Sequence, residues 1–108
     1  MTERAADRDS LYASAIADKI EKHPELLEIP LTNIDHWLLQ KHSAPHRLEQ
    51  WRILILDAKA SVDGMRRLLD ALREQNEEAK RLRLFSPFAG VLTTKERRRI
   101  IEQCAFSH

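Results

Sequence analysis

Glycine and proline are scarce in this sequence, and so are the turn dipeptides that connect β-strands. Its 108 residues include two glycines and four prolines. No segment alternates apolar and polar residues with β-branched side chains for long, so hairpins and sheets are not expected. Apolar side chains recur instead at intervals of three and four residues, which is typical of helices.

Cysteine and long hydrophobic runs are also rare. Cys104 is the only cysteine, so the chain cannot form an internal disulfide, and a reducing, cytoplasmic setting fits best. Residues 1–10 have mixed charge and no apolar run, unlike a signal peptide. The longest aliphatic run, residues 53–56, is far too short to span a membrane, so we expect no membrane partner.

The chain as a whole has no surplus of positive or negative charge, since its formal net charge is +1. This argues against a protein that is basic throughout and against an acidic disordered chain. The charge is nevertheless unevenly distributed. Residues 80–99 carry seven basic side chains and one acid, Glu96, whereas residues 1–79 have a net charge of −4. The local charge of such a segment is better evidence of a binding partner than the net charge of the whole chain.

The spacing predicts five or six short helices. Asp9 or Ser10 caps the first, which stops by His23 because Pro24 disfavours the α conformation in the residue before it. We expect residues 24–28 to form a helical turn that ends at Pro30. Thr32 is expected to cap the second helix.

Serines are expected to open the third and fourth helices. Ser43 precedes the third, with Pro45 in its first turn, where no intrahelical N–H bond is lost. Ser61 caps the fourth. The side chains expected to face inward from these two helices are Leu48, Trp51, Leu54, Ile55, Ala58, Val62, Met65, Leu68, Leu69 and Leu72.

Asn76 leaves two alternatives. The fourth helix either runs on through Ala79 and Leu82, or breaks at Asn76, which then caps a fifth; we favour the break. Thr93 and Glu96 have the spacing of a capping box for a last helix over roughly 94–104. Its inward side chains are expected to be Ile100, Ile101 and Cys104.

Together these elements predict an all-α fold: a compact bundle or array of five or six short helices with an irregular apolar hinge before the last one. Residues 1–8 are expected to be a frayed N-terminus and residues 9–84 the helical bundle. Residues 85–93 would be the apolar hinge, and residues 94–108 the C-terminal basic helix and tail.

Nothing in the sequence predicts catalysis or a cofactor. There is no glycine-rich phosphate loop, and no set of residues fills the roles of a catalytic site, so we expect a non-enzymatic protein without cofactors. His36, His42 and His46 lie within eleven residues, but Ser43 and Pro45 put a helix boundary between the last two. We therefore expect no metal site.

The segment around residues 85–99 is the candidate contact surface, and it allows two interpretations. Its apolar residues either fold back and cap the bundle, or form an arm that docks in a partner's groove while the basic residues meet acidic groups there. The candidate partner-binding residues are Phe85, Phe88, Val91, Leu92, Lys95, Arg97, Arg98 and Arg99.

Three stretches carry a resemblance to a known group: "HPELLEIPLTNIDHWL", "HSAPHRLEQWR" and "RLFSPFAGVLTTKERRRI". They resemble small bacterial proteins encoded beside nucleotidyltransferase-like toxins of the abortive-infection type. The resemblance covers roughly residues 11–102. It implies an antitoxin or accessory subunit that binds a toxin, and it identifies no contact residues.

The leading hypothesis is therefore a protein–protein interaction module, in its specific form an antitoxin with a toxin as its partner. The alternative is a small nucleic-acid-binding regulator that uses the basic helix, although a helix-turn-helix signal is weak and Trp37 and Trp51 are expected in the core. A third hypothesis is a homo-oligomer in which the last helix is swapped across the hinge at Pro87 and Gly90.

Overall fold

The structure, a computed structural model, describes residues 3–41 and 44–105, with side chains for 9–41 and 44–103. These ranges form six α-helices and one 3₁₀ turn without any strand, so the fold is all-α as predicted. The elements in chain order are α1 (Glu3–Lys22), η1 (Pro24–Leu27), α2 (Glu28–Leu39), α3 (Pro45–Ala60), α4 (Val62–Arg73), α5 (Glu77–Arg83) and α6 (Thr94–Ala105).

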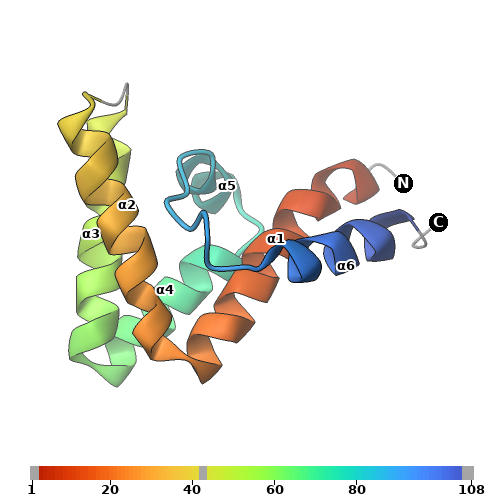
Figure 1. Cartoon of the computed structure of the whole chain (residues 1–108), viewed down its shortest axis with the longest axis horizontal. Coiled ribbons are helices and arrows are strands. Elements are labelled where there is room, and N and C mark those ends of the chain that lie inside the picture. Colours follow the sequence, from red (N-terminus) through yellow and green to blue (C-terminus); the bar gives the residue numbers. More distant parts are fainter. Residues whose placement is uncertain (1–2, 42–43, 106–108) are drawn as a thin grey trace.

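The helices pack as two pairs joined by α4 (Figure 1). The antiparallel pair α2 and α3 lies at one end, and α1 and α6 lie together at the other. Helix α4 contacts both α3 and α1, so it connects the pairs. Helix α5 and the segment that follows it lie between them in this view. The whole measures 40 × 30 × 26 Å.

The core follows the predicted helix faces closely. Trp51 at the centre of α3 is fully buried, and it belongs to one continuous cluster drawn from η1, four helices (α1–α4) and the segment before α6. Val62, predicted to face inward, is instead 80% exposed at the first position of α4. The buried members of the cluster are Ala17, Ile20, Leu27, Ile34, Leu48, Trp51, Ile55, Ala58, Leu68, Leu69, Leu72, Phe88 and Val91.

Two predicted caps form the expected hydrogen bonds. The Ser61 hydroxyl accepts from the Gly64 N–H at 2.9 Å, and the Asn76 side chain accepts from the Ala79 N–H at 2.8 Å. The break at Asn76 is therefore the correct alternative. Asparagine and serine do this because a short side-chain oxygen can reach the free N–H groups of the first turn.

Helix α2 begins earlier than predicted. Its first residue is Glu28, and it runs through Pro30, because a proline in the first turn forfeits no intrahelical hydrogen bond. Thr32 consequently lies inside the helix, where its hydroxyl donates to the Glu28 carbonyl at 2.9 Å rather than capping a terminus.

The starts of α1 and α3 also differ from expectation. Helix α1 begins at Glu3 rather than after Asp9 or Ser10, so residues 3–8 are helical instead of frayed. Ala44, which cannot cap through its side chain, immediately precedes α3. Ser43, the predicted cap, lies outside the described residues. Pro45 occupies the first turn as predicted.

Candidate functional site

The segment between α5 and α6 folds back onto the core of its own chain. Phe88, Val91 and Leu92 are only 3%, 1% and 9% exposed. The Phe88 ring meets Trp51 edge-on, with 5.2 Å between the ring centroids. Phe85, the remaining apolar candidate, is half-buried. The first three lie where the fold-back interpretation puts them, and in this arrangement they are not available as anchors for a partner.

Hydrogen bonds from neighbouring helices hold this irregular segment in place. The Asn33 side-chain amide, on α2, donates to the carbonyls of Pro87 and Ala89 at 2.8 and 2.9 Å. The Trp51 indole N–H donates to the carbonyl of Leu82, in the last turn of α5, at 2.9 Å and so fixes the helix from which the segment leaves. Backbone carbonyls outside a helix need such partners when they approach the interior, so the path of the segment is well determined.

A left-handed residue and a capping box then start α6. Gly90 has φ of +94°, a conformation that glycine adopts without the strain a Cβ would cause. Three residues later the Thr93 N–H donates to the Glu96 carboxylate at 2.7 Å, while the Thr93 hydroxyl accepts from the Glu96 N–H at 3.1 Å. The predicted capping box is thus confirmed.

Lys19 ties the start of α6 to α1. Its ammonium group donates to the Glu96 carboxylate at 2.7 Å and to the Val91 carbonyl at 2.8 Å. The hydrogen bond from Lys19, followed by that from the Thr93 amide, lowers the pKa of Glu96 to about 2. A charged contact, as well as burial of Ile100, therefore fixes α6 on α1.

The basic side chains of α6 face solvent. Lys95, Arg97, Arg98 and Arg99 are exposed, and none forms an ion pair with any residue in the described part of the chain. Arg97 lies over the ring of Tyr12, with its guanidinium carbon 5.9 Å from the ring centroid. The cations predicted as contact residues are thus available at the surface.

Arg83, also part of the basic segment at 80–99, behaves differently because it is buried. Its guanidinium donates to the Ala71 carbonyl at 2.9 Å and lies 3.6 Å from the Asp9 carboxylate. Its Nε and Nη2 atoms have no hydrogen-bond partner among the residues whose side chains are described. Arg83 therefore contributes to packing between α5, α4 and α1 and not to the exposed basic surface.

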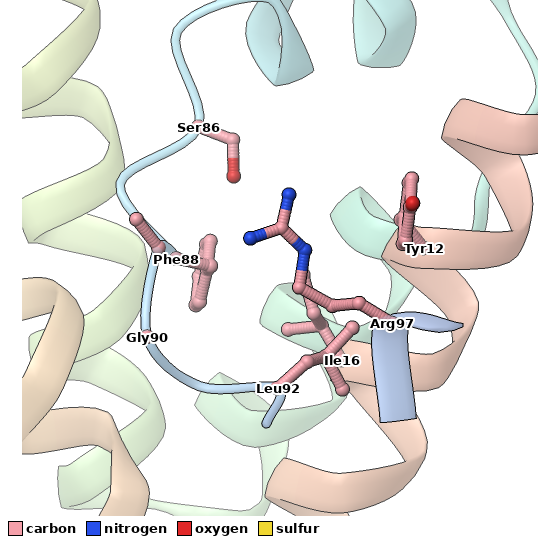
Figure 2. A pocket seen from close by; sticks show the side chains of 8 residues that line it. Tyr12, Ile16, Ser86, Phe88, Gly90, Leu92 and Arg97 are labelled. Atoms are coloured by element: carbon pink, nitrogen blue, oxygen red, sulfur yellow. The ribbon is translucent and has the colours of Figure 1, made fainter. Parts of the chain in front are cut away.

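A hollow of about 190 Å³ lies between α1, the segment at 86–92 and α6. Figure 2 shows the Arg97 guanidinium reaching into it between Tyr12 and Phe88, with the Ser86 hydroxyl on the opposite rim. We call it the Arg97 hollow. Its lining residues are Tyr12, Ile16, Ser86, Phe88, Ala89, Gly90, Leu92 and Arg97.

A second hollow, of about 230 Å³, lies along α6. Thr94, Arg98 and Ile101 line it together with Arg97. Arg97 therefore lines two surface depressions, and its charge can reach a group bound in either.

The contribution of α1 to this site was not predicted from the sequence. Tyr12, Ile16 and Lys19 follow a helical spacing of four and three, so they share one face. That spacing was a recognisable signal of a helix face, but nothing in the sequence indicated that α6 would pack against it.

Other kinds of site have little support. Among the residues with described side chains, no group of three or more histidine, cysteine or acidic residues is placed to hold a metal ion. His36 and His46 are exposed, whereas His42 and the Cys104 side chain fall outside the description. Within the described ranges, every helix is too short or too polar to cross a membrane.

Comparisons with known proteins add no assignment. No protein-family model, curated protein or solved structure matches this chain.

Proposed function

We propose that this protein is a non-enzymatic interaction module whose helix α6 docks on an acidic surface of a partner protein. The observation that carries the proposal is the set of four exposed cations on α6 without an ion-pair partner among the described residues. By contrast, Arg73 on α4 reaches both Asp18 and Glu21 of α1, at 2.7 and 3.1 Å.

The structure narrows the surface that can make this contact. Because Phe88, Val91 and Leu92 are buried, docking relies on the basic residues of α6 and on the Arg97 hollow beside them. Arginine is favoured at such interfaces because its planar guanidinium forms two parallel hydrogen bonds with a carboxylate.

In its specific form, we propose an antitoxin that neutralises a nucleotidyltransferase-like toxin, which the resemblance of the three stretches quoted above supports. A nucleotidyltransferase needs carboxylates to hold its catalytic metal ions. A basic helix laid over those carboxylates would block the metal site. The proposed role of α6 is to supply that positive surface.

Nucleic-acid binding is the second candidate, and the same four cations favour it. Phosphate contacts release counterions, so such binding weakens steeply as salt rises, whereas a protein interface that also buries side chains weakens less. The exposed Glu102 on the same helix would repel phosphates and partner carboxylates alike, so it does not separate the two candidates. We place the protein partner first because the resemblance of the three stretches implies one.

The experiment is affinity capture from the lysate of the native host, after nuclease treatment, with washes at low and high salt. The test variant carries Arg98→Glu and Arg99→Glu. Its matched control carries Arg66→Glu and Arg81→Glu, two exposed arginines on α4 and α5 that have no ion pair with a described residue.

We expect one near-stoichiometric protein to survive both treatments with the wild type and the control, and to be lost from the test variant. Its sequence then tests the antitoxin form directly. Recovery that disappears with nuclease or salt supports the nucleic-acid candidate instead. Light scattering of the purified protein tests the swapped homo-oligomer, for which a monomer mass is the contrary result.

A further inference from the structure

The Arg97 hollow combines an apolar floor with a polar rim. Ile16, Phe88 and Leu92 line its floor, and the Tyr12 and Ser86 hydroxyls and the Arg97 guanidinium lie around it (Figure 2). The Arg97 guanidinium lies over the Tyr12 ring, and its N–H groups have no hydrogen-bond partner among the described residues, so they can donate to a bound anion.

The volume of the hollow indicates the size of its occupant. Sites for small molecules and cofactors usually enclose roughly 300–1,000 Å³. A cavity of about 150 Å³ lined by apolar side chains is enough for one benzene ring. At about 190 Å³, the Arg97 hollow matches one large apolar side chain rather than a metabolite.

The charge around the hollow indicates what accompanies that side chain. Arg97 faces it, Arg98 and Arg99 follow on α6, and none of the three has an ion-pair partner in the described part of the chain. The acid nearest in sequence, Glu96, is already bound to Lys19 and the Thr93 amide. A carboxylate beside the apolar side chain would therefore find an unengaged guanidinium.

We propose that the Arg97 hollow binds a segment of the partner protein that presents one large apolar side chain with a carboxylate next to it. The side chain enters between Ile16 and Phe88, and the carboxylate pairs with Arg97. This rests on the proposed function in that the occupant belongs to a protein partner.

A nucleotide is a weaker fit to the same space. A buried base leaves polar edges that need hydrogen-bond partners, and the side chains of Ile16, Phe88 and Leu92 have none to offer. An aliphatic or aromatic side chain has no such requirement. The chemistry of the floor therefore favours a peptide.

The test is titration of the ¹⁵N-labelled full-length protein, followed by NMR. The probe is a capped hexapeptide with one phenylalanine flanked by glutamate and aspartate. Three comparison probes replace the phenylalanine by alanine, replace the acids by their amides, or substitute a six-nucleotide thymidine oligomer.

Variants separate the hollow from general electrostatics. Ala89→Leu fills the hollow without changing charge, since Ala89 is exposed and lines it. Arg97→Gln removes the proposed carboxylate partner. Arg66→Gln removes the same charge from an exposed residue of α4 that lines neither hollow, and it serves as the matched control. The dispersion of each NMR spectrum reports whether the variant is folded.

We expect saturable shifts at Tyr12, Ser86 and Arg97 with the phenylalanine probe, and affinity about tenfold lower for Arg97→Gln, Ala89→Leu and both altered peptides. Arg66→Gln should change affinity by less than about threefold. Absence of saturable binding near about 1 mM, equal binding of the alanine peptide, or tighter binding of the oligomer overturns the proposal.

Failure of this inference can be told apart from failure of the proposed function. If Ala89→Leu still captures the partner that Arg98→Glu with Arg99→Glu loses, docking through α6 stands and the role of the hollow is wrong. If no protein partner is captured at all, the proposed function itself fails.

Discussion

The junction between α3 and α4 and the junction between α1 and α6 are built in opposite ways. At the first, Gly64 brings the backbones so close that an added Cβ would overlap the Asp57 carbonyl and lie 2.9 Å from the Ala58 nitrogen. At the second, a lysine and a carboxylate hold α6 in place, and a hollow stays open beside it. The first junction has no room for a ligand, whereas the second exposes charge and space to a partner.

This difference shows how a small helical protein can be stable and still offer a binding surface. Close apolar packing stabilises a fold but leaves nothing exposed for recognition. A partly solvated ion pair contributes less, yet it responds to pH, salt and the charge of a partner. The four predictions below test the two junctions and the contacts between them, from the largest effect to the smallest.

Gly64→Ala should cause the largest loss, because the methyl group meets backbone atoms that cannot move aside. We expect the free energy of unfolding to fall by about 2–3 kcal/mol or more, measured by urea denaturation. Arg66→Ala, at an exposed position on the same helix, is the control. If Gly64→Ala instead stabilised the protein by about 1 kcal/mol, as helix propensity alone predicts, the close approach would be wrong.

Trp51→Phe affects the contact between the rigid junction and the segment leading to α6. It removes the indole donor to the Leu82 carbonyl and part of the edge-on contact with Phe88. We expect a loss of about 2 kcal/mol, again by denaturation. Leu39→Ala, at a position that is 83% exposed, should cost less than about 0.5 kcal/mol. Equal losses in the two variants would contradict the interpretation.

Glu96→Gln tests the charged junction through its pH dependence. Because folding lowers the pKa of Glu96 from 4.5 to about 2, its contribution to stability is complete above about pH 4.5 and is lost as the pH falls toward 2. At pH 7 the variant should be less stable by about 1 kcal/mol, since the carboxylate is 39% exposed and partly screened. That difference should shrink on acidification.

The measurement is denaturation of both proteins at pH 7, 4.5 and 3. The matched control, Glu102→Gln, removes an exposed carboxylate of the same helix that has no described ion-pair partner. It should change stability at pH 7 by less than about 0.5 kcal/mol. A difference between wild type and Glu96→Gln that stays constant over this range would show that Lys19 and Glu96 do not interact as described.

Arg83→Met should have the smallest effect. The arginine is buried, and its Nε and Nη2 atoms have no hydrogen-bond partner among the described residues. An apolar side chain of similar length therefore relieves a desolvation penalty, while it loses the hydrogen bond to the Ala71 carbonyl and the ion pair with Asp9. We expect stability within about 1 kcal/mol of the wild type. Arg83→Ala, which leaves a cavity, should be clearly worse. A large loss for methionine would mean that the contact with Asp9 carries substantial energy.

Much of the fold could be predicted because helix signals are local. Ser61 and Asn76 cap as expected, since a cap involves only the next three residues. The errors occurred where a residue type permits two roles. Pro30 can follow a helical turn or sit in the first turn of the next helix, and Thr32 can cap or bond inside a helix.

The candidate site was predictable only in part. The exposed cations of α6 lie within a charge run that the sequence displays openly, whereas Arg83 in the same run turned out to be buried. The other half of the site, Tyr12 and Lys19, comes from a helix about 75 residues away in the chain. No short-range rule connects the two.

What the sequence determined by itself is the helical class, the caps at Ser61, Asn76 and Thr93, and the position of the basic run, because each depends on residues within one or two turns. Only the tertiary structure decided that Phe88 enters the core, that Lys19 forms an ion pair with Glu96 and that Arg97 lines an open hollow. These outcomes depend on which helix faces meet. Burial and charge pairing between distant segments are set by the packing of the whole chain, and the local spacing of residues does not predict that packing.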